Sequence, residues 1–163
     1  MRVLGIDPGT ATTGLGLIAE DHPGQYSVLD VRVITTPAGL PAPERLIQIY
    51  QQIQDYILLH QPEAAAVEKL FFQRNVTSAF AVGQARGVVI LALAQAGVPI
   101  FEYTPLEVKQ AVTGYGAADK KQVQQMVKIL LNLEFTPKPD DAADALAIAI
   151  CHAGAARWKV EGA

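Results

Sequence analysis

The stretch RVLGIDPGTATTGLGLIA, residues 2–19, decides the fold class of this chain. Its first part, Arg2–Asp7, is a short apolar run closed by Pro8 and Gly9, a pair typical of a turn. Thr12–Ala19 then alternates, with glycines at positions 14 and 16. The pattern predicts two antiparallel strands joined by a tight turn, with Asp7 at the end of the first strand.

The periodicity of the apolar residues predicts the remaining elements. A third strand over Tyr26–Thr35 extends the antiparallel meander, and a buried strand over Ala64–Val67 delivers Glu68 at its end. The other expected elements, in chain order, are a helix through Leu46–Ile57 that ends before Pro62, a helix over about Val76–Ala96, a strand over Pro99–Tyr103, helices that start after Thr104 and at Asp119, and a last helix over about Asp140–Arg157. We write the order as βββαβαβαα, which predicts a single α/β domain over residues 1–163 with a mixed five-stranded sheet flanked by helices.

The predicted helix over Val76–Ala96 is apolar on nearly every side. Its apolar residues include Ala79, Phe80, Val82, Val88, Ile90, Leu91 and Leu93. A helix that is apolar all round has to be buried all round. In so small a domain this points to a subunit interface.

Composition and length place the chain among globular proteins of one domain. It has 163 residues, of which 50% are hydrophobic and 18% charged, outside the range of disordered chains. No run approaches the ~18 uninterrupted apolar residues of a membrane span, and the first residues lack the apolar core of a signal peptide. The single cysteine excludes an internal disulfide and favours a reducing compartment. We therefore expect a cytoplasmic protein with no membrane partner.

Charge is distributed unevenly along the chain, whose net charge is −3 (13 basic minus 16 acidic residues). Residues 1–68 hold 3 basic and 8 acidic side chains, residues 69–138 hold 8 and 4, and the last 25 residues hold 2 and 4. The middle segment is therefore basic, at 8 − 4 = +4, between two acidic segments. A net acidic chain is not the usual footprint of a nucleic-acid-binding protein. If the acids bind metal ions, however, the total understates how well the surface could attract an anion.

Four acidic residues stand at positions where α/β folds place their sites. Asp7 ends the first strand, and Glu68 follows the buried strand directly. Asp141 and Asp144, at positions i and i+3, share one face of the first turn of the last helix. Carboxylates gathered in one place repel one another unless cations bind between them. Hard oxygen ligands of this kind predict Mg²⁺ or Mn²⁺.

Each acid also has a purely structural interpretation. Asp7 before Pro-Gly could be a turn residue, and Asp140, Asp141 and Asp144 could cap a helix and complement its dipole. For Asp140 we expect capping to be the role. Glu68 is harder to explain in this way, because an acid after a buried strand is costly unless something uses it.

Five short segments form a recognisable set of motifs: GIDPGTATTG at 5–14, VEKLFFQRN at 67–75, GQARGV at 83–88, VKQAVTG at 108–114 and DDAADALAIA at 140–149. Together they resemble the RuvC family of bacterial Holliday junction resolvases. The similarity runs in order from Arg2 to about His152. It implies a ribonuclease H-like fold and a homodimeric endonuclease that resolves four-way DNA junctions by paired symmetric nicks, in homologous recombination and DNA repair. It further implies the RuvA–RuvB branch-migration complex as a partner.

The resemblance also implies the composition of the catalytic site. Asp7, Glu68, Asp141 and Asp144 match the family's catalytic, metal-binding acids, whereas Asp140 does not. Two Mg²⁺ ions per active site are implied, with Mn²⁺ as a substitute. Two metals ~4 Å apart can bind a phosphodiester between them, one activating water and the other stabilising the leaving 3′ oxygen, which yields a 5′-phosphate and a 3′-hydroxyl.

Basic residues predicted to contact DNA lie in the basic middle segment. On the helix that starts at Asp119, we expect Lys120, Lys121 and Lys128, together with Gln124, to form a stripe that binds phosphates. This stripe would lie opposite the core residues Val123 and Val127, and a merely solvated face is the alternative. By the resemblance, Lys109 and Lys120 match family positions that contact DNA or support the metal site.

Two aromatic residues follow the strand that carries Glu68. By the resemblance, Phe71 aligns with an aromatic that stacks on a base at the crossover, as in single-strand binders. Loop aromatics usually fold back into the core, so either Phe71 or Phe72 could do so instead. Arg74 is expected beside the DNA backbone.

Two other families share part of the pattern. Ile6–Thr10 also resembles the phosphate-binding hairpin of actin-like ATPases and sugar kinases, which enclose a nucleotide between two such lobes and need about twice this length. Noncatalytic or single-strand-directed relatives of the YqgF type keep only the first motif. The Asp141-x-x-Asp144 pair and the Phe71–Arg74 segment argue against that alternative.

Overall fold

The structure of the chain, a computed structural model, describes residues 1–69 and 76–161. The strands are β1 (Arg2–Asp7), β2 (Thr12–His22), β3 (Gln25–Thr35), β4 (Ala64–Glu68) and β5 (Ile100–Tyr103). The helices are α1 (Ala42–His60), α2 (Val76–Gln95), α3 (Pro105–Thr113), α4 (Lys120–Leu130) and α5 (Asp140–Glu161). Three helices follow β5, as the individual predicted elements required, whereas the written order βββαβαβαα included only two of them.

The short helix α3 begins at a capping box, which explains why it is a separate element. Thr104 accepts a hydrogen bond from the Glu107 amide at 3.1 Å, and the Glu107 carboxylate accepts one from the Thr104 amide at 2.6 Å. Helix α4 begins in the same way, with Asp119 at the cap and Gln122 as the reciprocal partner. The predicted helix starts after Thr104 and at Asp119 are both confirmed.

The five strands form one mixed sheet in the order β3-β2-β1-β4-β5. The first three strands are antiparallel neighbours, whereas β4 is parallel to both β1 and β5. Asp7 lies opposite Gly14 of β2, and Ile6 lies opposite Val67 of β4. In the ladder between β1 and β4, Asp7 and Glu68 each directly follow the last paired residue, so they lie at the carboxyl ends of two adjacent parallel strands.

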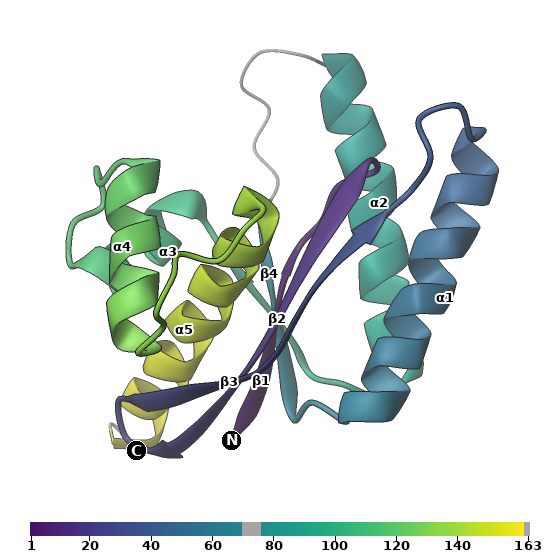
Figure 1. The fold of residues 1–163 in the computed structure, drawn as a ribbon. Helices are drawn as coiled ribbons and strands as arrows, with labels where there is room; N and C mark the ends of the chain where they lie inside the picture. Colours follow the sequence, from purple (N-terminus) through teal and green to yellow (C-terminus); the bar gives the residue numbers. More distant parts are fainter. Residues whose placement is uncertain (70–75, 162–163) are drawn as a thin grey trace.

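Helices cover both faces of this sheet, with α1 and α2 on one face and α3, α4 and α5 on the other (Figure 1). Alternate strand residues supply the two cores. Leu4 and Ile6 of β1 pack under α1 and α2, while Val3 belongs to the core beneath α5. The same alternation turns Gly5 and Asp7 toward α5. The predicted architecture of a mixed five-stranded sheet flanked by helices is confirmed.

Glycines allow α5 to lie directly on the sheet. A Cβ atom added to Gly5 would lie 1.9 Å from the carbonyl oxygen of Ala145, and one added to Gly14 would lie 2.1 Å from the carbonyl oxygen of Asp141. Both contacts are far inside the closest approach of real atoms, so any side chain here would push α5 outward. The glycines of the opening motif thus set how close Asp141 comes to the sheet.

Helix α2 is buried on one side only. Its inward residues Ala85, Val89, Ala92 and Leu93 are buried, but a stripe of residues 76, 80, 84, 87 and 91 is exposed, including Val76, Phe80 and Leu91. Within a single copy of the chain, the expectation of burial all round is therefore not met. We call this stripe the outer face of α2.

By length and composition, α2 is also the one helix among residues 1–69 and 76–161 that could cross a membrane. One such helix is weak support for a membrane span, since interface and core helices pass the same test. Its Arg86 forms an ion pair with Glu102 of β5, which ties the middle of the helix to the sheet.

Candidate active site

The turn between β1 and β2 is held in place by hydroxyl groups. The Thr13 side chain, which is fully buried, donates to the carbonyl of Gly9 at 2.7 Å and accepts from the Gly9 amide at 3.3 Å. Thr36, directly after β3, donates to the carbonyl of Thr10 at 2.6 Å. These bonds fix the loop that follows Asp7, so the direction of the chain after this carboxylate is determined by the fold.

Asp141 and Asp144 approach the sheet from the first turn of α5. Asp141 accepts a hydrogen bond from the Thr12 hydroxyl of β2 at 3.1 Å between Oγ1 and Oδ2. Asp144 lies 3.3 Å from the ammonium nitrogen of Lys120 on α4. One acid is therefore tied to the sheet and the other to α4.

Asp140 plays a different part from its two neighbours. It is the first residue of α5, and its carboxylate bonds to Lys120 Nζ at 3.3 Å and to Gln124 Nε2 at 3.0 Å. These contacts hold α4 against the start of α5. The expected cap is thus, in the structure, a link between two helices.

The electrostatics of the four acids show that they lie within reach of one another. Burial, as the largest cause, and then the negative charges of Asp144, Glu68 and Asp141, in that order, together raise the pKa of Asp7 from its usual 3.8 to about 7. Burial and Asp144 also raise the pKa of Glu68, while burial, with smaller contributions from its acidic neighbours, raises that of Asp144. The acids form one coupled group that has too little positive charge around it.

Two lysines provide part of the missing charge. Lys120 lowers the pKa of Asp7, Glu68 and Asp144, and Lys109 lowers that of Glu68. Glu68, Asp144, Lys109 and Lys120 line a cavity of about 250 Å³ between the sheet and helices α3, α4 and α5. Over the described residues, no three His, Cys, Asp or Glu side chains reach the spacing of a metal-ligand group.

The structure places the predicted DNA-binding lysines along α3 and α4. Lys109 is half-buried in the cavity described above, Lys121 is exposed, and Lys128 is partly exposed. Lys120 and Gln124 turn toward the start of α5 rather than directly away from Val123 and Val127, because both bond to Asp140. The predicted sites Phe71, Phe72 and Arg74 lie outside the described residues.

Comparison with known proteins matches this arrangement to one family. Residues 3–152 match the family of the crossover junction endodeoxyribonuclease RuvC. The RuvC protein of Chloroflexus aggregans is 61% identical over 153 residues, which cover 94% of this chain and 93% of that protein. The chain belongs to the RuvC family. The predicted family membership is confirmed.

Two solved structures of Thermus thermophilus RuvC share the fold of this RuvC family member. The free protein matches with a TM-score of 0.91 at 42% identity, covering 98% of this chain and 97% of the other. The same protein in complex with a Holliday junction substrate matches with a TM-score of 0.93 at 42% identity, covering 98% and 96%. The ribonuclease H-like fold implied by the resemblance is confirmed.

Several residues that shape this RuvC family site could not be singled out from the sequence. Thr12 was expected only as part of a strand, yet it bonds to Asp141, 129 positions away. Arg86 of α2 donates through Nε to the carbonyl of Glu68 at 3.4 Å. The signal for Thr12 was its place in the glycine-rich opening motif, and Arg86 stood in the GQARGV segment, but neither motif reveals its partner.

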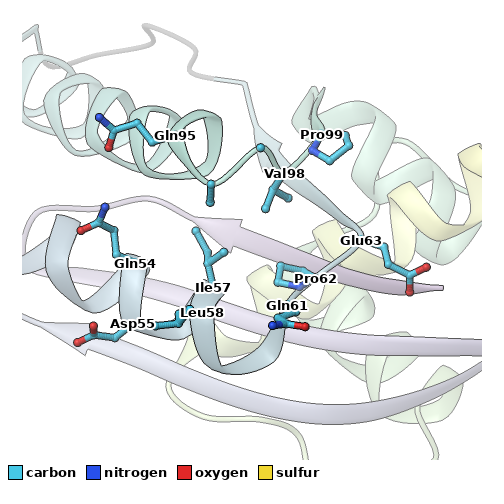
Figure 2. A pocket seen from close by; sticks show the side chains of 12 residues that line it. Gln54, Asp55, Ile57, Leu58, Gln61, Pro62, Glu63, Gln95, Val98 and Pro99 are labelled. Atoms are coloured by element: carbon cyan, nitrogen blue, oxygen red, sulfur yellow. The ribbon is translucent and has the colours of Figure 1, made fainter.

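A larger cavity, of about 760 Å³, lies at the opposite end of the sheet (Figure 2). Ile57 of α1 and Val98 face each other across it, and Pro62 and Pro99 stand just before the starts of β4 and β5. The residues lining it include none of the predicted site residues. The coupled acids lie at the carboxyl ends of β1 and β4, so this cavity is separate from the candidate active site.

Proposed function

We propose that this chain is a crossover junction endodeoxyribonuclease that resolves four-way DNA junctions by paired, symmetric nicks in homologous recombination and DNA repair. The observation that carries the proposal is the group of coupled acids Asp7, Glu68, Asp141 and Asp144 at one edge of the sheet. Support comes from the similarity to a RuvC protein solved with a Holliday junction substrate.

The donor chemistry of the coupled acids fits hard divalent cations. All four side chains offer carboxylate oxygens, and the buried charge of Asp7, Glu68 and Asp144 leaves a demand for cations that Lys109 and Lys120 meet only in part. We assign Asp7, Glu68, Asp141 and Asp144 as ligands of two Mg²⁺ ions, for which Mn²⁺ can substitute. When bound, such ions supply an activated water and stabilise the leaving 3′ oxygen.

The chain's own residues then orient the reaction. Thr12 holds one carboxylate oxygen of Asp141, Oδ2, through its hydroxyl. Lys120, at 3.3 Å from both Asp144 and Asp140, balances negative charge beside the scissile phosphate. The pKa of Asp7 near 7 means that a proton on this group competes with a cation, so the site loads more readily as pH rises.

The DNA would run across the basic side of the site. Lys109, Lys121 and Lys128 are the proposed phosphate contacts beside Lys120. They stand on α3 and α4, the helices whose Lys109 and Lys120 line the cavity that also holds Glu68 and Asp144. From the sequence, Phe71, or Phe72 in its place, is proposed to stack on a base at the crossover, and Arg74 is proposed to lie beside the DNA backbone. The RuvA–RuvB complex is the proposed protein partner, and the cytoplasm the proposed compartment.

A homodimer would cover the outer face of α2. This face exposes Val76, Phe80 and Leu91, and a Cβ atom added to Gly87 would meet nothing within 4 Å. An exposed apolar stripe with a small residue in its middle suits two helices that cross closely about a two-fold axis. Two active sites related by that axis would make symmetric nicks on opposing strands of one junction.

Cleavage of an immobile four-way junction, compared with a linear duplex of the same sequence, tests the proposal. With Mg²⁺ or Mn²⁺ we expect symmetric nicks with 5′-phosphate and 3′-hydroxyl ends that a ligase can seal, and little cleavage of the duplex. Asp55→Asn, an exposed aspartate on α1, is the matched control for substitutions of the acids. Equal cleavage of duplex and junction, or hydrolysis of ATP without cleavage, would refute the assignment.

A further inference from the structure

Arg86 of α2 contacts the backbone that carries one of the coupled acids. Its Nε donates to the carbonyl oxygen of Glu68 at 3.4 Å, and its Nη2 pairs with the carboxylate of Glu102 on β5. The guanidinium side chain is 19% exposed, so most of it lies against the protein. Arg86 thus joins a helix on one face of the sheet to the end of β4.

The position of this contact matters because, on the β1 side, Glu68 has no partner in the ladder. The ladder between β1 and β4 ends with Ile6 opposite Val67, one residue earlier. On the other side, Glu68 lies opposite Tyr103, and the next amide, that of Lys69, donates to the Tyr103 carbonyl at 2.7 Å. Arg86 adds a side-chain donor at the point where the backbone leaves the sheet.

The direction of the Glu68 side chain follows from that backbone. Val67 packs in the core under α1 and α2, so the alternation of the strand turns Glu68 toward α5. There the charge of Glu68 raises the pKa of Asp7, and the charge of Asp144 raises the pKa of Glu68. A peptide free to rotate at Glu68 would carry the carboxylate away from these partners.

We propose that Arg86 is a positioning residue for the metal site: by holding the Glu68 carbonyl, with Glu102 as its anchor, it fixes the backbone that directs the Glu68 carboxylate at the other acids. The expected effect of Arg86 on cleavage rests on the proposed function, whereas its expected effect on metal binding does not. Arg86 acts from the α2 side of the sheet, opposite the side from which DNA would approach the acids. A phosphate contact is the competing role, and its guanidinium is already paired.

The chain offers a matched control in Arg2. Arg2 donates through Nη1 to the His60 carbonyl at 3.1 Å and pairs with Glu63 at 3.7 Å, the same pattern of carbonyl and carboxylate. It stands at the start of β1, at the end of the sheet remote from the coupled acids. Arg2→Gln therefore removes equivalent bonds without touching the proposed site.

The experiment measures Mn²⁺ binding to the full-length protein by electron paramagnetic resonance of the free ion, without DNA. We expect Arg86→Gln to weaken Mn²⁺ binding about 10-fold, as expected for a residue that orients a ligand, and Arg2→Gln to leave it unchanged. Arg86→Lys, which keeps a donor, should recover part of the loss. In cleavage, Arg86→Gln should need more Mn²⁺ for half-maximal rate, with unchanged junction affinity.

Three results would overturn the inference. The first is that Arg86→Gln binds Mn²⁺ as tightly as the wild type, and the second is that Arg2→Gln loses as much Mn²⁺ affinity as Arg86→Gln. The third is that Arg86→Gln lowers the log–log salt slope of junction binding by about one unit, which is the mark of a lost phosphate contact. Should Arg86→Gln fail to fold, Glu102→Gln removes the anchor instead, and unchanged Mn²⁺ binding in that variant counts against the role. If the wild-type protein does not cut junctions while Arg86→Gln still weakens Mn²⁺ binding, the proposed function fails and the positioning role stands.

Discussion

Replacing Asp7 by asparagine should make the metal-free protein more stable, although it should destroy its activity. Burial and three acidic neighbours raise the pKa of Asp7 to about 7, so at alkaline pH the folded state holds a charge in an unfavourable place. Asparagine has nearly the same shape and carries no charge. The substitution therefore removes the penalty while keeping the packing.

The size of the effect follows from the pKa. A rise from 3.8 to about 7 is roughly 3 pKa units, which at about 1.4 kcal/mol per unit sets a ceiling of about 4 kcal/mol at pH 8. Because the folded-state pKa is raised, the metal-free protein is most stable below pH ~4 as far as Asp7 is concerned, and it loses stability progressively as pH rises from about 4 to about 7. At pH 5 the advantage of Asp7→Asn should fall to about 2 kcal/mol, since Asp7 is then largely protonated in the folded protein.

Thermal unfolding in the presence of a chelator measures this difference. For a chain of this length, about 4 kcal/mol corresponds to roughly 8 °C or more in Tm, so Asp7→Asn should melt that far above the wild type at pH 8 and about half as far above it at pH 5. Asp55→Asn should shift Tm little at either pH. Adding Mg²⁺ at pH 8 should stabilise the wild type and not Asp7→Asn.

Two outcomes would contradict the reasoning. If Asp7→Asn melts at or below the wild type at pH 8, the charge of Asp7 is not a burden on the folded state. If its advantage is the same at pH 5 and pH 8, the gain comes from packing or hydrogen bonding and not from the ionisation of Asp7.

Three further predictions address cleavage, assembly and DNA binding. Asp144→Asn should lower junction cleavage by more than about 100-fold without loss of junction binding, while Asp140→Asn retains substantial activity; equal losses in a cleavage assay would show that the assignment along α5 is wrong. Gly87→Glu should convert a dimer of about twice 17.4 kDa to a monomer in light scattering with little change in Tm, because a side chain at Gly87 meets no atom within 4 Å in one copy of the chain; a variant that stays dimeric would exclude this face. Lys121→Ala should reduce the log–log salt slope of junction binding by about 0.9. Phe71→Ala should leave that slope unchanged but lose ~1–3 kcal/mol of stacking, so that it cleaves intact junctions more slowly than junctions with mismatches at the crossover. A sharply lower Tm for Phe71→Ala would instead indicate that Phe71 is a core residue.

Local signals were sufficient to predict most of the elements. Apolar alternation and the Pro-Gly turn located β1, and a short apolar run located β4, so Asp7 and Glu68 could be placed at strand ends before their proximity was known. The i, i+3 spacing likewise placed Asp141 and Asp144 on one face of α5. Short-range rules are sufficient to place these four acids, because the position of each one follows from the strand or helix that carries it.

Contacts between distant elements were beyond those rules. From the sequence, Lys120 belonged to a helix face that either binds DNA or is merely solvated. Only the packing of α4 against α5 shows that Lys120 lies between Asp140 and Asp144. Helix α2 had the composition of a helix buried on all sides, but a single copy of the chain covers only the side that holds Val89 and Leu93. Pairing partners that are 20 or more residues apart leave no periodic trace in the sequence.

The proposed active site and the core around Leu146 are both built on the contact between α5 and the sheet, but different residues determine stability and activity. Gly5 and Gly14 allow α5 to reach the sheet, so a side chain at either position should move the helix, disturb the core around Leu146 and separate the acids at the same time. Burial and mutual repulsion of the carboxylates oppose the metal-free fold, and for Asp7 these effects outweigh the attraction of Lys120. Substitutions at the glycines should therefore lower stability and activity together, whereas amide substitutions at the acids should separate the two, and this difference distinguishes the residues that build the site from those that perform its chemistry.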